Sequence, residues 1–189
     1  MTAHSTTANA KVANTTDLQR IAAVMCFAIA IGGALAEVVL AWIWLYPDYV
    51  ATYVVPHLGL MGVPVSLNFG ARLAGFFVCM IPLSVLFYAS HQAYELFEAF
   101  RLGDVFTASA PIRLRRIGLS MIALAFLQPL SSTLLGVVLT ASNPEGQRIL
   151  SLGISINDYI IALFGGLILA IAHVMVEAAH MADDHRQII

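Results

Sequence analysis

Two groups of histidine and glutamate residues are the part of the sequence whose types and spacing could do chemistry. They are His91, Glu95 and Glu98, and His173, Glu177 and His180. In each group the residues follow at intervals of four and then three, a spacing that places them on one face of a helix. Imidazoles and carboxylates on facing helices build the di-metal sites of helix bundles. The spacing allows such a metal site. The simpler interpretation is a polar interfacial face that forms hydrogen bonds with neighbouring helices and the central arginines.

Other reactive chemistry has little basis in the sequence. The same spacing also allows a haem with His91 and His173 as its two axial ligands, and this alternative is kept. The sequence contains no Gly-rich phosphate loop, nucleophile elbow or Walker motif. Cys26 and Cys79 lie inside apolar runs, as small buried hydrophobic residues do. We therefore predict no cofactor and keep a metal or haem as the alternative.

The segments that carry these groups are predicted to cross a membrane. The 189 residues are 60% hydrophobic and 11% charged, whereas soluble domains carry about 25% charged residues. The charged residues gather at the chain ends, in one central loop and near residues 145–148, and the intervals between them are apolar. A membrane span needs about 20 apolar residues. With a net charge of −2 and no basic domain, nucleic acid is not an expected partner.

Four spans are predicted, at about residues 21–45, 71–89, 117–140 and 159–176. Asn68 is positioned to cap the second helix, whose pattern continues to Arg101. Thr107 or Ser109 starts the next helix, with Pro111 in its first turn. The fold class is thus an all-α integral membrane four-helix bundle.

The remaining segments complete this prediction. Residues 1–16 are polar and aperiodic, which predicts a disordered tail before a single transmembrane domain at 17–189. Residues 65–68 and 154–157 alternate apolar and polar side chains, a pattern that allows a short two-stranded ribbon in the outer loops. The first span ends in aromatic residues typical of a membrane interface, namely Trp42, Trp44, Tyr46 and Tyr49.

Basic residues predict the orientation. One side of the four-span arrangement would hold Lys11, Arg20, Arg101, Arg113, Arg115, Arg116 and Arg186, and the other side Arg72 and Arg148. Because Lys and Arg near span ends favour the cytoplasm, both termini are predicted to be cytoplasmic. The expected location is the bacterial inner membrane, as a multi-pass protein.

Two polar residues fall inside the predicted spans. An ionisable side chain at that depth is costly, so we expect Glu37 to be buried against another helix, with Gln128 or Arg72 as its partner. Gln128 precedes Pro129, a position for a kink that offers a polar group to a neighbouring helix.

The central loop, residues 94–118, is expected to organise the turn between spans two and three. Gly103 should end the helix with a positive φ, and Phe106 should fold back onto the bundle. Arg113 and Arg116 should lie at the headgroup level. The acidic residues within their reach are Glu95, Glu98 and Asp104.

A family resemblance rests on this loop. After an aromatic-rich helix end come Gly103, Phe106, a capping Ser or Thr, Leu114, Arg116, Ile117 and Gly118. The pattern resembles a bacterial family of four-helix membrane proteins catalogued as domain of unknown function 2975, and it extends to Ile154-Ser155-Ile156 before the last span. The resemblance implies a regulatory partnership, because some members are encoded beside small helix-turn-helix regulators. It implies no catalytic residues. The chain departs from the family at Asp183-Asp184-His185.

Three classes of function remain open. The first is a regulatory or accessory subunit, without catalytic chemistry, that binds another protein or a further copy of itself in the bilayer. The second is a metal- or haem-dependent redox protein that uses the His/Glu faces. The third is a small oligomeric transporter or channel, for which Glu37 and Gln128 are the mid-membrane polar candidates.

Overall fold

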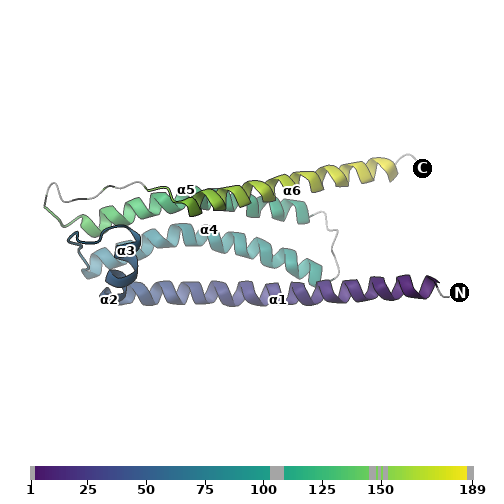
Figure 1. Cartoon of the computed structure of the whole chain (residues 1–189), viewed down its shortest axis with the longest axis horizontal. Coiled ribbons are helices and arrows are strands. Elements are labelled where there is room, and N and C mark those ends of the chain that lie inside the picture. Colours follow the sequence, from purple (N-terminus) through teal and green to yellow (C-terminus); the bar gives the residue numbers. More distant parts are fainter. Residues whose placement is uncertain (1–2, 103–108, 145–147, 149, 151–152, 187–189) are drawn as a thin grey trace.

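The computed structural model is all-helical (Figure 1) and describes residues 3–102, 109–144, 148, 150 and 153–186, with side chains of residues 18–177 within these ranges. The long helices are α1 (Ala3–Leu45), α4 (Phe69–Arg101), α5 (Ala110–Thr140) and α6 (Ile156–Arg186). Between α1 and α4 lie α2 (Pro47–Tyr49), the π-helix η1 (Val50–Val54) and α3 (Val55–His57). These three short elements form a cap over one end of the molecule, called here the cap end. Both chain termini lie at the opposite, terminal end.

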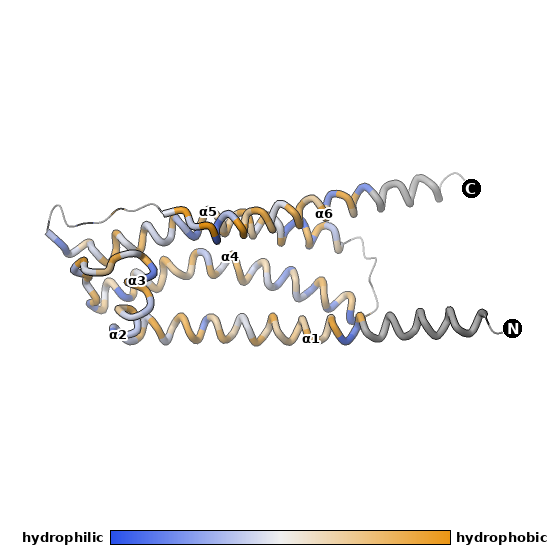
Figure 2. The backbone as a smooth tube through the Cα atoms, viewed as in Figure 1, coloured by the Kyte–Doolittle hydropathy of each residue, from blue (hydrophilic) through white to orange (hydrophobic). Residues whose placement is uncertain are grey.

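All four long helices are long and apolar enough to cross a membrane, as predicted. The candidate spans are Leu18–Leu45, Phe69–Arg101, Ala110–Thr140 and Ile156–Glu177. Hydrophobic residues follow each helix over most of its length (Figure 2). Helix α1 begins at Ala3, within the segment 1–16 for which the sequence predicts a disordered tail.

The four helices pack in chain order and do not close into a bundle. Helix α1 packs on α4, α4 on α5, and α5 on α6, and the other pairs of long helices touch at most marginally over their described residues. In Figure 1, α4 and α5 lie behind, while α1 and α6 lie in front and apart from each other. The predicted set of four helices is therefore present as a row that is open between its first and last helices, α1 and α6.

Glycine allows close approach at two of these helix pairs. A β-carbon on Gly118 of α5 would lie 2.9 Å from the carbonyl oxygen of Gly165 on α6, and one on Gly165 would lie 2.9 Å from that of Gly118. A β-carbon on Gly33 of α1 would lie 3.2 Å from the Phe87 ring of α4. Small residues that let helix backbones approach are typical of membrane helix packing.

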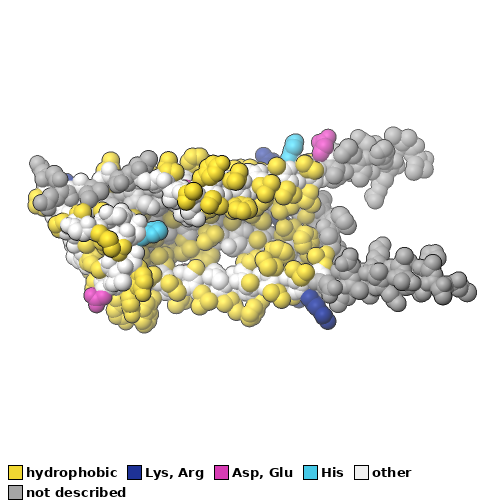
Figure 3. Space-filling view, in the orientation of Figure 1, with side chains coloured by type: hydrophobic (Ala, Val, Ile, Leu, Met, Phe, Trp, Pro, Cys, Tyr) yellow, Lys and Arg dark blue, Asp and Glu magenta, His cyan; other side chains and the backbone are white. Residues whose placement is uncertain are grey.

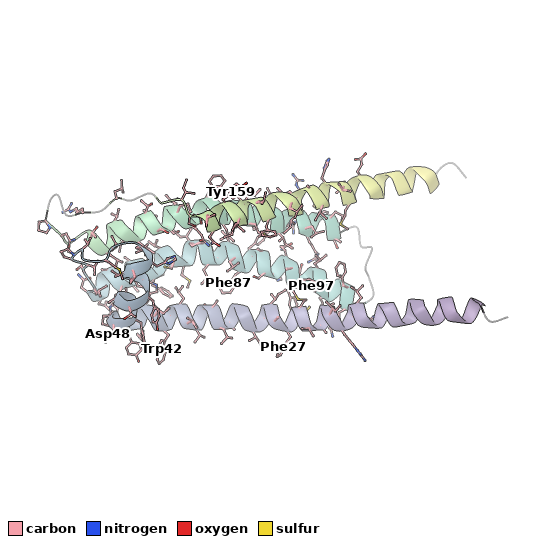
Figure 4. The ribbon with its side chains drawn as sticks, in the orientation of Figure 1. Phe27, Trp42, Asp48, Phe87, Phe97 and Tyr159 are labelled. Carbon is pink, nitrogen blue, oxygen red and sulfur yellow. The ribbon has the colours of Figure 1, made fainter. Side chains whose placement is uncertain are left out.

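The buried core lies at the cap end, where the short helices fold over α5. Val50 and Leu139 are fully buried there, and Leu60 is nearly so. Trp44 also belongs to this core, with its indole ring against Gly75 of α4. Trp44, which the sequence placed in an aromatic belt at the membrane interface, is thus buried within the protein, whereas its neighbour Trp42 is exposed (Figure 4).

Local signals set several helix ends. The Asn68 side chain accepts a hydrogen bond of 2.7 Å from the Ala71 amide and caps α4, as predicted. Helix α4 ends at Arg101 and α5 begins after Ser109, again as predicted. Gly103 and Phe106 lie outside the described residues, so their roles remain predictions.

A capping box begins α6 where the sequence suggested a strand. The Asp158 carboxylate accepts from the Ser155 amide at 2.8 Å, and the Ser155 hydroxyl accepts from the Asp158 amide at 3.3 Å. Ile156 and Asn157 therefore lie in helix. No ribbon is assigned in the part of the chain that the structure describes, so the strand prediction for these residues is corrected.

Candidate functional site

The open side of the helix row contains a groove that all four long helices line, called here the four-helix groove. Its volume is about 520 Å³. The lining residues include Ile29, Ala36 and Leu40 of α1, Cys79, Leu86 and Ser90 of α4, Ile117, Leu124 and Gln128 of α5, and Ile161 of α6. The space-filling view shows this face hollowed between α1 and α6 (Figure 3). The groove is mainly apolar and is open on the side between α1 and α6.

Gln128 is the polar side chain that the sequence predicted for a helix contact, and it lines this groove. Its side-chain amide has no hydrogen-bond partner among the described residues. The local backbone is arranged around Pro129: the Ser132 hydroxyl donates to the Gln128 carbonyl at 2.9 Å, and the Thr133 hydroxyl to that of Pro129 at 2.8 Å. The Gln128 amide thus remains available to a group that enters the groove.

A second polar cluster lies at the terminal end, between α4 and α5. Arg113 of α5 forms an ion pair with Glu95 of α4, one of the acidic residues expected within its reach. His91 lies 3.5 Å from the other oxygen of Glu95. Arg116 instead donates to the buried Gln92 of α4 at 3.4 Å. The cluster therefore joins α4 to α5 by charge and hydrogen bonds.

The structure brings only part of the two His/Glu groups together. Glu98 is paired along its own helix with Arg101, whose Nε donates to it at 2.8 Å. His173 and Glu177 are exposed on α6, which packs mainly on α5, away from the α4 group. The described residues contain no cluster of three or more possible metal ligands. The side chain of His180 lies outside them, so the metal and haem sites remain predictions.

Glu37 is not placed as the sequence predicted. It is exposed on α1 and has no hydrogen bond or ion pair with the residues described here. Arg72, one of its expected partners, instead donates to the carbonyl oxygens of Trp44 and Leu45 at the end of α1. The prediction that Glu37 is buried is thus wrong for the single chain, where both expected partners lie elsewhere: Arg72 binds the carbonyl end of α1 and Gln128 lines the groove.

Sequence reasoning missed the groove and the anchors of the cap end. Ser90 and Ile161 line the groove, yet neither stands out in an apolar run. The contact between Trp44 and Gly75 also left no sequence signal, because it joins residues of two helices. Another overlooked feature, the capping box of Ser155 and Asp158, does have a sequence signal, because Ser-x-x-Asp before an apolar run is a known pattern of helix starts.

Four apolar helices that pack in sequence define an all-α, multi-pass membrane protein. The family described as "Protein of unknown function (DUF2975)" matches residues 43–189, and the chain belongs to that family. The match covers the cap, α4, α5 and α6, so it reaches further toward the N-terminus than the resemblance seen in the sequence. Comparison with curated proteins found no match. Comparison with solved structures found none either.

Proposed function

We propose that the protein is a non-enzymatic accessory subunit that binds a transmembrane helix of another membrane protein in the four-helix groove. The observation that carries this proposal is Gln128, whose amide lines the groove without a partner among the described residues. A polar group at apolar depth is unfavourable unless it is hydrogen-bonded. A partner helix with a Ser, Thr, Asn or Gln at the same depth would provide that bond.

The shape of the groove fits this occupant. Its lining residues extend along α1 from Ile29 to Leu40 and along α4 from Cys79 to Ala93, so the groove follows the long helices as an elongated partner requires. The side opening between α1 and α6 lets a helix enter from the bilayer without moving a polar headgroup through apolar protein. Burial of apolar surface drives little association in lipid, so packing and the Gln128 hydrogen bond would supply the affinity.

Charge supports an orientation with both termini in the cytoplasm of a bacterial inner membrane. Arg101 ends α4 and the three arginines Arg113, Arg115 and Arg116 begin α5, at the same end of the molecule as both termini (Figure 1). Arg72 lies at the cap end, beside the last turn of α1. The more basic end faces the cytoplasm under the positive-inside rule.

Photo-crosslinking in native membranes tests the proposal. A benzophenone amino acid at Ser90 or Ile161 samples the groove, and one at Phe126, which is 73% exposed, samples α5 outside the groove-lining residues. We expect one and the same protein adduct from both groove positions and none from Phe126. Gln128→Leu should reduce the groove adduct, while Gln128→Asn should largely retain it. Lipid adducts alone, or adducts unaffected by Gln128→Leu, would overturn the proposal.

The metal or haem redox protein and the oligomeric transporter remain alternatives. Metal analysis and an absorption spectrum of the purified protein test the first. No observation on the described residues favours either of them over partner binding.

A further inference from the structure

Helix α1 carries a line of exposed residues that faces away from the four-helix groove. The residues, named here the α1 stripe, are Ala23, Phe27, Ala30, Ala34, Glu37 and Ala41. They recur every three or four positions, the spacing of a seam between two packed helices. Ala36 lines the groove, and Glu37 follows it directly, so the two side chains point about 100° apart. Figure 4 shows Phe27 pointing away from the other helices.

The polar member of this stripe lacks a partner. Glu37 is exposed and forms no hydrogen bond or ion pair with any described residue. It lies about 8 Å along the helix axis from Trp42, at 1.5 Å per residue, on the membrane-centre side of the exposed aromatic residues. Carboxyl groups at such depth face protein or water and not lipid. A protein surface that covers the stripe would meet this requirement.

The shape of the surface suits a second helix. Two grooves between α1 and α4 adjoin the stripe, one of about 310 Å³ bordered by Ala41 and one of about 340 Å³ bordered by Ala23, Phe27 and Ala30. The alanines let a helix backbone come close. Phe27 projects beside the second groove, so a facing copy of this residue would find space in it.

We propose that a second copy of the chain packs on the α1 stripe, in a two-fold dimer in which the Glu37 carboxyl groups hydrogen-bond to each other. Two copies inserted with the same topology place each residue at the same depth. A two-fold axis along the membrane normal therefore brings Glu37 opposite Glu37. A carboxyl group offers both an O–H donor and an acceptor oxygen, so the two Glu37 side chains can satisfy each other and no basic residue from a different chain is needed.

The dimer uses a different face of the protein from the four-helix groove of the proposed function. An experiment can therefore refute either proposal while the other holds. Cysteine cross-linking of the full chain in membranes tests the dimer, in a background with Cys26→Ala and Cys79→Ala. Single cysteines at Ala30, Ala34 or Ala41 should form disulfide-linked dimers on mild oxidation, since a disulfide needs Cα atoms about 4.4–6.8 Å apart. Cysteines at Leu35 or Val39, exposed elsewhere on α1, are the matched controls. Equal cross-linking at all positions, or none on the stripe, would overturn the dimer.

The carboxyl pairing is tested separately, with the Ala41→Cys variant as reporter. Glu37→Leu should lower the dimer association constant about threefold to tenfold, the size of an interhelical hydrogen bond in lipid. Glu37→Gln, which keeps a donor and an acceptor, should remain close to the parent. An equally strong dimer in Glu37→Leu would refute the pairing. A product containing a different protein, or a loss of dimer as large in Glu37→Gln as in Glu37→Leu, would favour a basic hetero-partner and contradict the proposal.

Discussion

The indole ring of Trp44 on α1 occupies the space that a β-carbon at Gly75 of α4 would need. Trp44 is only 4% exposed and joins the buried cluster at the cap end. Arg72, one turn before Gly75, donates to the Trp44 and Leu45 carbonyls. The end of α1 is thus held against the start of α4 by two features: Gly75 has no side chain to block the indole ring, and the Arg72 guanidinium binds the last carbonyl oxygens of α1.

The Trp44 contact predicts a cost for any side chain at Gly75. We expect Gly75→Ala to lower the free energy of unfolding in detergent by about 1–3 kcal/mol, because the indole must move. Gly32→Ala is the matched control, since nothing lies within 4 Å of a β-carbon there. Alanine is favoured over glycine in a helix by about 0.5–1 kcal/mol, so this control should be neutral or stabilised. Equal melting of the two variants would contradict the contact.

The crossing of α5 and α6 predicts a non-additive pair. Gly118→Ala and Gly165→Ala should each destabilise the protein, because each new methyl group meets the opposite backbone at 2.9 Å. The double variant should cost less than the sum, since one displacement of α6 relieves both clashes. Gly166→Ala, with open space around it, serves as the control. The effects are measured by thermal melting of the four variants and the parent protein. Strict additivity of the two single effects in the double variant would argue against a shared contact.

The ion pair between Glu95 and Arg113 should be stronger than the pair within α4. It joins two helices and both side chains are partly covered, whereas Glu98 and Arg101 are three residues apart on one helix. A double-mutant cycle with alanine should give a coupling energy above about 0.5 kcal/mol for the first pair. The second should give about 0.5 kcal/mol or less. The reverse order would show that Arg113 does not hold α5 to α4.

The capping box predicts the start of α6. Ser155→Ala should lower stability by about 0.5–2 kcal/mol, because the hydroxyl would no longer accept from the Asp158 amide. Asn157→Ala, at an exposed position of the first turn, should change stability by less than about 0.5 kcal/mol. Chemical denaturation of the two variants is the measurement. A Ser155→Ala protein as stable as its parent would argue against the cap.

Fusion reporters test the proposed orientation. A reporter after Ile189 and one inserted near Asp104 should both read as cytoplasmic, because seven of the nine basic residues fall on that side. A reporter near Gly146 should read as external. The same location for Asp104 and Gly146 would contradict a span between them.

Sequence predicted the features that depend on neighbours along the chain. The Asn68 cap, the end of α4 at Arg101 and the start of α5 at Ser109 all follow from residues within one helical turn. The contact between Arg113 and Glu95 was also among the predicted possibilities, because few residues separate their two helices along the chain. These signals do not depend on how the helices pack.

Features that depend on which helix faces which were not predictable. In a membrane helix, lipid-facing and protein-facing side chains are both apolar, so hydropathy cannot give the order of packing. The open row of α1, α4, α5 and α6 and the exposure of Glu37 are consequences of that order. The alternation at residues 154–157 was misleading for another reason, because the polar residues there cap a helix instead of lining one side of a strand.

Packing in chain order also bears on how the molecule folds. Each long helix after α1 packs on the long helix made just before it. Helix α4 can dock on α1 while α5 is still being synthesised, and α6 is the last to dock, on α5 alone. Loop-closure entropy is small for such near neighbours, which favours rapid assembly. Biogenesis therefore does not have to wait for the C-terminal helix, and a nascent chain that has emerged through Thr140 already contains every helix that contributes to the buried core at the cap end.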